Sequence, residues 1–207
     1  CTTFPKLSEQ FIQREVDGLR ARPGSIDLEI VSLWGGEQLY KGVPILTFPK
    51  WKLLHLLWSL PWALIRQPGT LVKSLGKFFT DKPPSMLNFF ETALGYGYAI
   101  VNWVSIKKDP PDLIHGIWAT SPVSAAYFLS ALTGVPFSMG AHAFDVFEDG
   151  GDWHLQEKLK EAVMIHSSSG NTGRQLLRLG ADEKKLRVIR RGLVDFPEFK
   201  PLRHNRK

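Results

Sequence analysis

Residues 113–141, LIHGIWATSPVSAAYFLSALTGVPFSMGA, contain a complete strand–helix–strand unit. The apolar run at 113–118 predicts a strand. The Ser-Pro pair at 121–122 predicts a helix start, because serine is a good N-cap and proline is favoured in the first turn. The helix ends before Gly134, and residues 137–141 predict a second strand. Two strands joined by a helix run parallel, and ligands bind such sheets at the carboxyl ends of the strands.

Strands and helices alternate through most of the remaining chain. Apolar or alternating runs predict strands, and amphipathic runs between polar caps and glycine or proline predict helices. The predicted strands are residues 2–5, 26–33, 43–48, 163–167 and 186–189, and the predicted helices are residues 8–22, 153–162 and 172–179. We therefore predict one α/β domain over residues 1–207, with a Rossmann-like parallel sheet and helices on both faces.

The start of the chain carries two further predictions. Ser8 is a suitable N-cap for the first helix, and Leu7 is expected to pack against Ile12. The strand before this helix is represented only by its last turn, and the chain begins with Cys1 rather than methionine. A chain that lacks its first strand and a lipoprotein cleaved before its cysteine both fit this start, and we favour the first.

Residues 50–106 interrupt the alternation and predict a helical insertion of three helices. Trp51, Trp58 and Trp62 occur there among basic residues, which are Lys50, Lys52, Arg66, Lys73 and Lys77. This composition is typical of helices at an anionic membrane surface, but a helical cap packed on the domain would explain it equally. Residues 53–65 are too few to span a bilayer, which requires about 20 apolar residues.

The net charge of +6 favours anionic partners, which include nucleic acid, an acidic membrane surface and phosphate-bearing substrates. No nucleic-acid recognition motif accompanies the charge, so we expect no nucleic-acid partner. Cys1 is the only cysteine, which excludes an intrachain disulfide and a cysteine-based zinc site and favours a cytoplasmic setting. The glycine motifs of dinucleotide and phosphate loops are missing, and we expect neither a cofactor nor a metal.

The loop after residues 137–141 carries the most informative polar side chains. His142 lies among small residues at the ligand-binding end of a strand, where it is expected to face a cleft and bond a substrate hydroxyl. Asp145 is expected either to orient this imidazole or to cap the next segment. A histidine satisfied within its loop and a helix-capping aspartate explain the same residues.

Further candidates for substrate binding lie in or near the other loops at this edge. They are Lys6, Ser8, His115, Ser121, Asn171 and Arg190. Ser121 opens a helix, and the N-terminus of a helix can bind phosphate. A solvated charge, a helix cap, or a buried histidine bonded to the backbone would be the ordinary structural explanation of each.

Several segments of the chain occur in a characteristic order. They are FPKLSEQFI at 4–12, the histidine strand and Ser-Pro helix at 115–126, GVPFS at 134–138, AHAFD at 141–145, and the stretches 167–171, 179–180 and 188–199. This succession resembles the N-terminal domain of bacterial exopolysaccharide glycosyltransferases of the large retaining family 4, which have the GT-B fold. The resemblance covers nearly the whole chain except residues 50–106.

The resemblance implies a transferase that moves a sugar from a nucleoside-diphosphate donor to a glycan or lipid-linked acceptor in polysaccharide biosynthesis, with retained stereochemistry. It implies that this domain holds the acceptor and that a C-terminal domain, absent from this chain, binds the nucleotide sugar. It places His142 near the transferred sugar, with Asp145 as its catalytic neighbour, and puts Lys6 and Ser8 on the acceptor side.

Two positions depart from the pattern of that family. Ile117 stands where many members have a second histidine, and Arg190-Arg191 stands where an uncharged residue is common. The alternative function is a non-enzymatic half-protein that binds a glycan or lipid and pairs with a separate catalytic subunit. Either protein is expected in the cytoplasm, and the membrane interpretation adds peripheral attachment to the inner face of the cell membrane.

Overall fold

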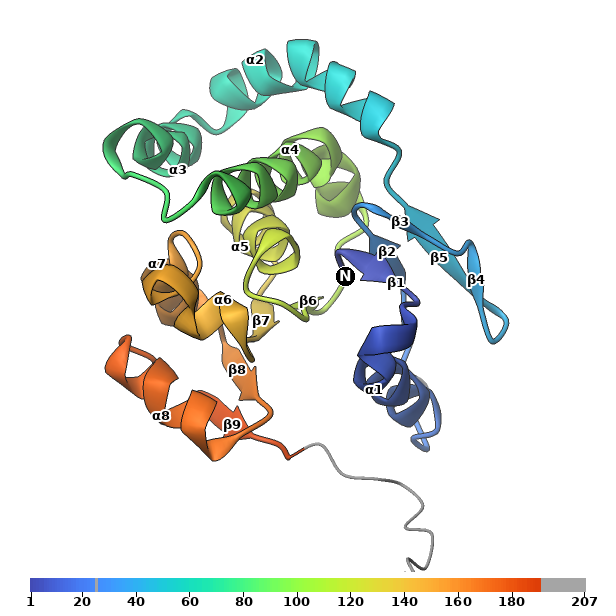
Figure 1. The fold of residues 1–207 in the computed structure, drawn as a ribbon. Coiled ribbons are helices and arrows are strands. Elements are labelled where there is room, and N and C mark those ends of the chain that lie inside the picture. Colours follow the sequence, from blue (N-terminus) through green and yellow to red (C-terminus); the bar gives the residue numbers. More distant parts are fainter. Residues whose placement is uncertain (25, 191–207) are drawn as a thin grey trace, which may run out of the picture.

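The computed structural model describes residues 1–24 and 26–190. Its main sheet has four strands in the order β6-β7-β8-β9, and all neighbours run parallel. The strands are β6 (Ile114–Gly116), β7 (Phe137–Gly140), β8 (Met164–Ser167) and β9 (Leu186–Val188). Helices flank this sheet (Figure 1), which confirms the predicted Rossmann-like α/β fold.

The connections of the main sheet follow the predicted alternation. The linking helices are α5 (Ser121–Thr133), α7 (Leu155–Glu161) and α8 (Gly170–Arg178), and a short α6 (Phe144–Phe147) and a 3-10 turn, η3 (Glu148–Gly150), precede α7. Gly134 adopts a φ of 83° after α5, as a helix-ending glycine should. Phe137, Met139 and Ile165 lie in the buried core between the strands and these helices.

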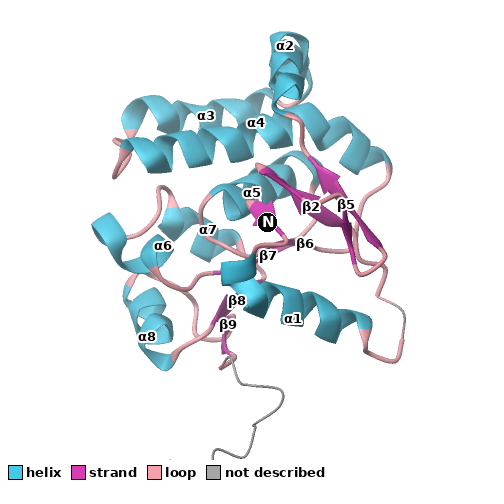
Figure 2. Cartoon of the chain, turned by 45° about the vertical axis from the view of Figure 1, so that its right-hand side comes forward, coloured by secondary structure: helices cyan, strands magenta, loops and turns pink. Residues whose placement is uncertain are grey.

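The N-terminal strands lie beside the main sheet (Figure 2). They are β1 (Thr3–Phe4), β2 (Ile30–Ser32), β3 (Gly35–Gly36), β4 (Leu39–Tyr40) and β5 (Val43–Thr47). β2 and β5 pair in parallel, and β1 pairs with β3 in parallel. The backbone N–H of Leu33 donates to the carbonyl of Cys1 at 3.0 Å, which places the first residues next to β2.

Two details in this region differ from the sequence prediction. The strand expected at 26–33 is reduced to β2, and β4 adds an antiparallel pairing to β5 that was not predicted. The turn between β4 and β5 is Lys41-Gly42, with φ values of 46° and 82°. Positive φ at both central residues is the requirement of a tight hairpin turn, and lysine at the first position hides this signal in the sequence.

The first helix begins later than predicted. Leu7–Glu9 form a 3-10 turn, η1, and α1 covers Gln10–Arg20. Ser8 lies inside η1 and caps nothing, and Leu7 is 88% exposed, so both expectations about this helix start were wrong. Ile12 is buried, and it packs in one core cluster with Phe4, Ile30, Ile45 and Ile117. That cluster joins α1, the N-terminal strands and the loop after β6.

The three helices predicted between residues 50 and 106 are present. A 3-10 segment η2 (Lys50–His55) leads into α2 (Leu56–Arg66), and α3 (Pro68–Thr80) and α4 (Met86–Lys108) follow. α4 lies against α5, where the rings of Tyr96 and Phe128 stack with their centroids 4.4 Å apart. α2 lies on the outer side of α4 (Figure 1). Within residues 1–24 and 26–190, no helix has both the length and the hydropathy needed to cross a bilayer.

Replacing Gly95 by alanine should loosen the contact between α4 and α5. A Cβ at this position would lie 2.6 Å from the carbonyl oxygen of Ser121 and 2.8 Å from the backbone nitrogen of Ala125. Because backbone atoms cannot turn away, we expect Gly95→Ala to lower the free energy of unfolding by about 2 kcal/mol or more. Urea unfolding followed by circular dichroism measures this change.

Gly18 in α1 provides the matched control, because nothing lies within 4 Å of a Cβ there. Gly18→Ala should raise the free energy of unfolding by about 0.5–1 kcal/mol through the better helix propensity of alanine. Equal effects of the two substitutions would contradict the close packing of α4 on α5.

Candidate functional site

A crevice of about 150 Å³ opens where β1 and β6 end. We call it the β1–β6 crevice, and its lining residues are Thr2, Thr3, Lys6, Glu9, Glu91, Trp118, Thr120 and Phe144. These residues come from β1 and the residues on either side of it, η1, α4, the loop after β6, and α6. The crevice therefore lies at the carboxyl edge of the strands, where ligand binding was predicted.

One wall of the crevice is polar. The ammonium group of Lys6 lies 3.0 Å from Oε1 of Glu9, and the indole Nε1–H of Trp118 donates to Oε2 of Glu9 at 3.3 Å. The Lys6 side chain is about half exposed, whereas that of Glu9 is largely covered. Of the predicted binding residues, Lys6 therefore lies where the sequence placed it, and Glu9 was missed.

A second wall, which adjoins the polar one at Trp118, is aromatic. Trp118 and Phe144 stack with their ring centroids 5.6 Å apart and an angle of 25° between the ring planes. The exposed fraction of Phe144 is 45%, so the pair presents a partly open apolar face to a ligand. Flat apolar faces next to hydrogen-bonding groups suit ligands that have both apolar and polar surfaces.

His142 lies behind this wall instead of facing the crevice. The residue is 4% exposed. The centroid of its ring lies 5.4 Å from the ring centroid of Trp118, 6.0 Å from that of Phe11 and 5.2 Å from that of His166. The imidazole folds back over Gly140, whose missing Cβ would lie 2.9 Å from Nε2. The small residues of this loop thus give the ring room to turn inward, and the expectation of an open orientation was wrong.

Asp145 is buried and fixes two loops to each other. Its carboxylate accepts hydrogen bonds from the backbone N–H groups of Ala119 at 3.0 Å, His142 at 3.1 Å and Ala143 at 2.8 Å. Burial raises its pKa, although the three backbone bonds oppose that shift. Asp145 lies inside α6, whose N-cap is Ala143 without a side-chain cap bond, so the expected helix cap was wrong. The carboxylate instead joins the loop after β6 to the loop after β7.

Lys158 holds the same stretch of backbone from the other side. Its fully buried ammonium donates to the carbonyl of Ala119 at 2.9 Å and forms an ion pair with the buried carboxylate of Asp152. Asp152 also accepts a hydrogen bond from the side-chain amide of Asn88 at 2.9 Å. This network could not be predicted from the sequence, because Lys158 follows the polar pattern of a solvent-exposed helix face.

Glu91 extends from α4 into the crevice region. One of its carboxylate oxygens is buried without a hydrogen-bond partner among the described residues. Burial and the nearby charge of Asp152 raise the pKa of Glu91 to about 7, while Lys158 and a hydrogen bond with Thr120 act against that shift. The crevice therefore contains a carboxyl group that exchanges a proton near neutral pH.

Ser121 and His115 lie away from the lining of the crevice. Ser121 is fully buried, and its hydroxyl donates to the backbone carbonyl of Glu91 at 2.9 Å. It does not cap α5, whose N-cap is Thr120, so the cap expected at Ser121 was wrong. In β6, Nδ1 of His115 lies 2.8 Å from the hydroxyl of Ser138 on β7, and the His115 side chain is exposed.

The remaining predicted residues are also outside the crevice. Ser8 is exposed in η1, Asn171 is exposed in the first turn of α8, and Arg190 is exposed after β9. Arg191 and the segment 192–199 lie outside the described residues.

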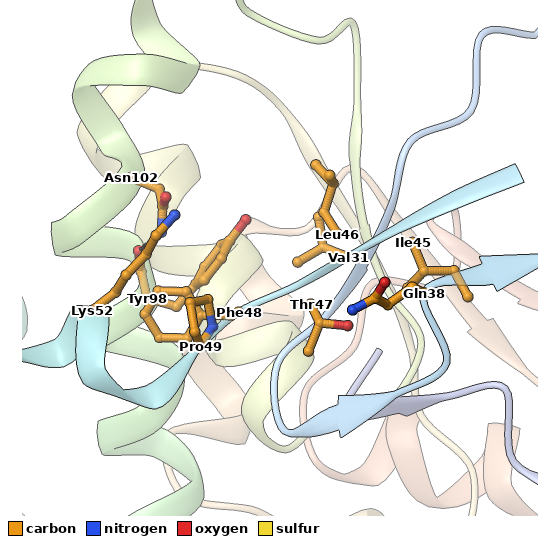
Figure 3. A pocket seen from close by; sticks show the side chains of 10 residues that line it. All are labelled: Val31, Gln38, Ile45, Leu46, Thr47, Phe48, Pro49, Lys52, Tyr98 and Asn102. Atoms are coloured by element: carbon orange, nitrogen blue, oxygen red, sulfur yellow. Dashed lines mark hydrogen bonds between the residues drawn. The ribbon is translucent and has the colours of Figure 1, made fainter.

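A second cavity of about 430 Å³ lies between β5 and α4 (Figure 3). Its lining residues are Val31, Gln38, Ile45, Leu46, Thr47, Phe48, Pro49, Lys52, Tyr98 and Asn102. The side-chain amide of Asn102 donates to the carbonyl of Tyr98 at 2.8 Å, and burial raises the pKa of the Tyr98 phenol to about 12. This cavity shares no lining residue with the β1–β6 crevice.

Comparison with known proteins adds no family assignment. No protein-family model matches the chain, and no curated protein sequence matches it significantly. Across the described part of the chain, no cluster of three or more His, Cys, Asp or Glu side chains is arranged to hold a metal ion.

Replacing Lys158 by methionine should strongly destabilise the fold. The substitution leaves the carboxylate of Asp152 buried without its cation and the carbonyl of Ala119 without its donor. We expect a loss of about 3–5 kcal/mol in the free energy of unfolding, measured by urea titration. The double variant Lys158→Met with Asp152→Asn should lose less, because the unpaired charge is gone.

The matched control is the partly exposed ion pair between Lys77 and Glu157. Lys77→Met should change stability by less than about 1 kcal/mol, because such pairs are screened by solvent. A Lys158→Met protein as stable as Lys77→Met would contradict the buried network.

Replacing Glu91 by glutamine should change how stability depends on pH. The pKa of Glu91 is raised in the folded state, so the folded protein binds the proton more tightly than the unfolded chain does. The stabilising contribution of the protonated carboxyl is therefore lost as pH rises from about 4.5 to about 7. Between about pH 5 and pH 8, wild type should lose about 1–2 kcal/mol relative to Glu91→Gln, a value reduced for partial exposure.

Thermal and urea unfolding of the two proteins across this pH range measures the difference. Asp145, whose pKa is also raised, is present in both proteins, so its titration is common to the two pH profiles apart from its charge interaction with Glu91. Parallel pH profiles would show that Glu91 titrates at its ordinary value.

Proposed function

We propose that this chain is the acceptor-side domain of a retaining glycosyltransferase that uses a nucleoside-diphosphate sugar. The observation that supports this function best is the β1–β6 crevice, which combines an aromatic wall with carboxylate and ammonium groups at the carboxyl edge of a parallel sheet. Sugars have apolar C–H faces and rings of hydroxyl groups, and the two walls match these two kinds of surface.

In this proposal the acceptor sugar rests against Phe144 and Trp118. Glu9 and Lys6 exchange hydrogen bonds with its hydroxyl groups, because they already lie 3.0 Å apart and can reorganise around a ligand. Glu91 accepts from a hydroxyl group when ionised and donates to one when protonated, and both states are populated near neutral pH. The acceptor is a glycan or a lipid-linked sugar of polysaccharide biosynthesis.

The donor requires a second domain. A diphosphate needs several cations or backbone N–H groups, but Lys6 is the one cation among the eight described residues that line the crevice, and Glu9 already neutralises it. We propose that a C-terminal domain supplies the nucleotide-sugar site and closes over the crevice. No resident cofactor enters the proposed reaction.

His142 and Asp145 act through the backbone and the aromatic wall in this proposal. The carboxylate of Asp145 is already engaged with three backbone N–H groups, so its part is to position the loops and not to move a proton. The imidazole of His142 supports the Trp118 ring from behind. A direct contact between His142 and the transferred sugar would require its ring to turn outward when the second domain closes.

Sugar binding to the crevice is tested by nuclear magnetic resonance with methyl glycosides of glucose, galactose and N-acetylglucosamine as probes. The indole Nε1–H signal of Trp118 should shift with at least one of them, because this group bonds Glu9 in the crevice wall. The indole signal of Trp103, which is buried between α4 and α5, is the internal control. Glu9→Gln should weaken binding about tenfold through loss of a charged hydrogen bond.

Turnover separates the transferase from the alternative binding half-protein. The full-length product of this gene should release nucleoside diphosphate from a UDP- or GDP-sugar when a sugar acceptor is present, and Trp118→Ala should reduce that release. A product that binds glycosides in the crevice but releases no nucleoside diphosphate would favour the half-protein. Absence of any shift at Trp118 would contradict sugar binding in the crevice, and with it both the transferase and a glycan-binding half-protein.

A further inference from the structure

The outer face of η2 and α2 is apolar although it meets solvent. Its exposed side chains recur three or four residues apart, which is the spacing of one helix face. They are Trp51, Leu54, Trp58, Trp62 and Ile65, between 45% and 73% exposed. We call this set the α2 stripe, and Leu57 beside it is 74% exposed.

The inner face of α2 is apolar as well. Ala63 is fully buried, and Leu56 and Leu60 pack with it against the core cluster of α4 and α5. α2 lies on the outside of the structure (Figures 1 and 2), and the exposure of the stripe residues shows that the described part of the chain leaves them uncovered. A surface helix normally carries polar residues on its solvent side, and an exposed apolar row of this length marks an interaction surface.

The charged residues of the segment that carries the stripe are all basic. Residues 38–80 contain no Asp or Glu, and their cations are Lys41, Lys50, Lys52, Arg66, Lys73 and Lys77. Lys41 and Lys77 form ion pairs with Asp17 and Glu157, which leaves Lys50, Lys52, Arg66 and Lys73 as the cations that can meet an anionic surface. Such a segment attracts an anionic surface, and each basic residue near an acidic bilayer contributes about 1 kcal/mol.

Aromatic rings and cations are paired at both ends of the stripe. The guanidinium of Arg66 lies 4.5 Å from the ring centroid of Trp62, and the ammonium of Lys50 lies 3.9 Å from that of Trp34. Tryptophan rings next to basic groups are typical of the boundary between lipid headgroups and acyl chains, where one side is apolar and the other is polar and charged.

We infer that η2 and α2 dock the protein on a membrane surface that contains anionic lipid. The α2 stripe enters the acyl boundary while the lysines and Arg66 meet the headgroups. The structure thus favours the membrane interpretation of Trp51, Trp58 and Trp62 over the interpretation as a fully packed cap, since each of the three residues is at least 45% exposed. This docking surface does not depend on the proposed transferase function.

The experiment is co-sedimentation of the chain with vesicles of phosphatidylcholine and phosphatidylglycerol in about a two-to-one ratio. The test variant combines Leu54→Ser, Trp58→Ser and Ile65→Ser, which remove three side chains of the stripe. Wild type should bind these vesicles and should bind pure phosphatidylcholine vesicles much more weakly. The test variant should bind the anionic vesicles at least about tenfold more weakly than wild type does.

The matched control variant removes three exposed apolar side chains elsewhere, with Leu39→Ser, Leu113→Ser and Val163→Ser. It should bind anionic vesicles like wild type, and near-ultraviolet circular dichroism should show all three proteins folded. Equal vesicle binding by the test variant and wild type would overturn the inference. A wild type that ignores vesicles but self-associates in sedimentation equilibrium, with association lost in the test variant, would assign the stripe to a second copy instead.

Discussion

The peptide group of Ala119 is held by buried charge on both sides. Its N–H donates to the carboxylate of Asp145, and its carbonyl accepts from the ammonium of Lys158. Both side chains are buried, so neither bond competes with water and each charge depends on its partners. Trp118 and Thr120 flank this peptide and line the β1–β6 crevice, and the shape of the crevice follows from this anchor.

The same network reaches the other parts of the site. Asp145 fixes the start of the loop that carries Phe144, and Asp152 connects the Lys158 ammonium to Asn88 on α4. Glu91, one turn further along α4, lies in the crevice. The helix that contributes this carboxyl also packs against α2, so the α2 stripe and the crevice belong to one continuous packed unit. A preformed site of this kind loses little conformational entropy when a ligand binds.

The alternation of strands and helices could be predicted from sequence because it depends on local patterns. The runs around Phe137 and Ile165 and the glycine at 134 indicate buried strands and a helix end without tertiary information. The start of α1 could not be predicted, since Ser8 has the right chemistry for a cap but the chain turns through η1 first. The β4–β5 hairpin was missed because Lys41 adopts a positive φ that lysine rarely takes.

The site was predictable in position but only partly in composition. Loops at the carboxyl edge of the sheet were expected, and Lys6 lies there, yet Glu9, Glu91 and Trp118 depend on contacts between distant segments. The direction of the His142 ring depends on the space above Gly140, which no local pattern reveals. The most direct test of the anchor is native-state hydrogen exchange of the Ala119 amide, followed by nuclear magnetic resonance. We predict exchange as slow as that of the β7 core amides, which exchange through global unfolding. Exchange as fast as that of the exposed residue Gly24 would contradict the account.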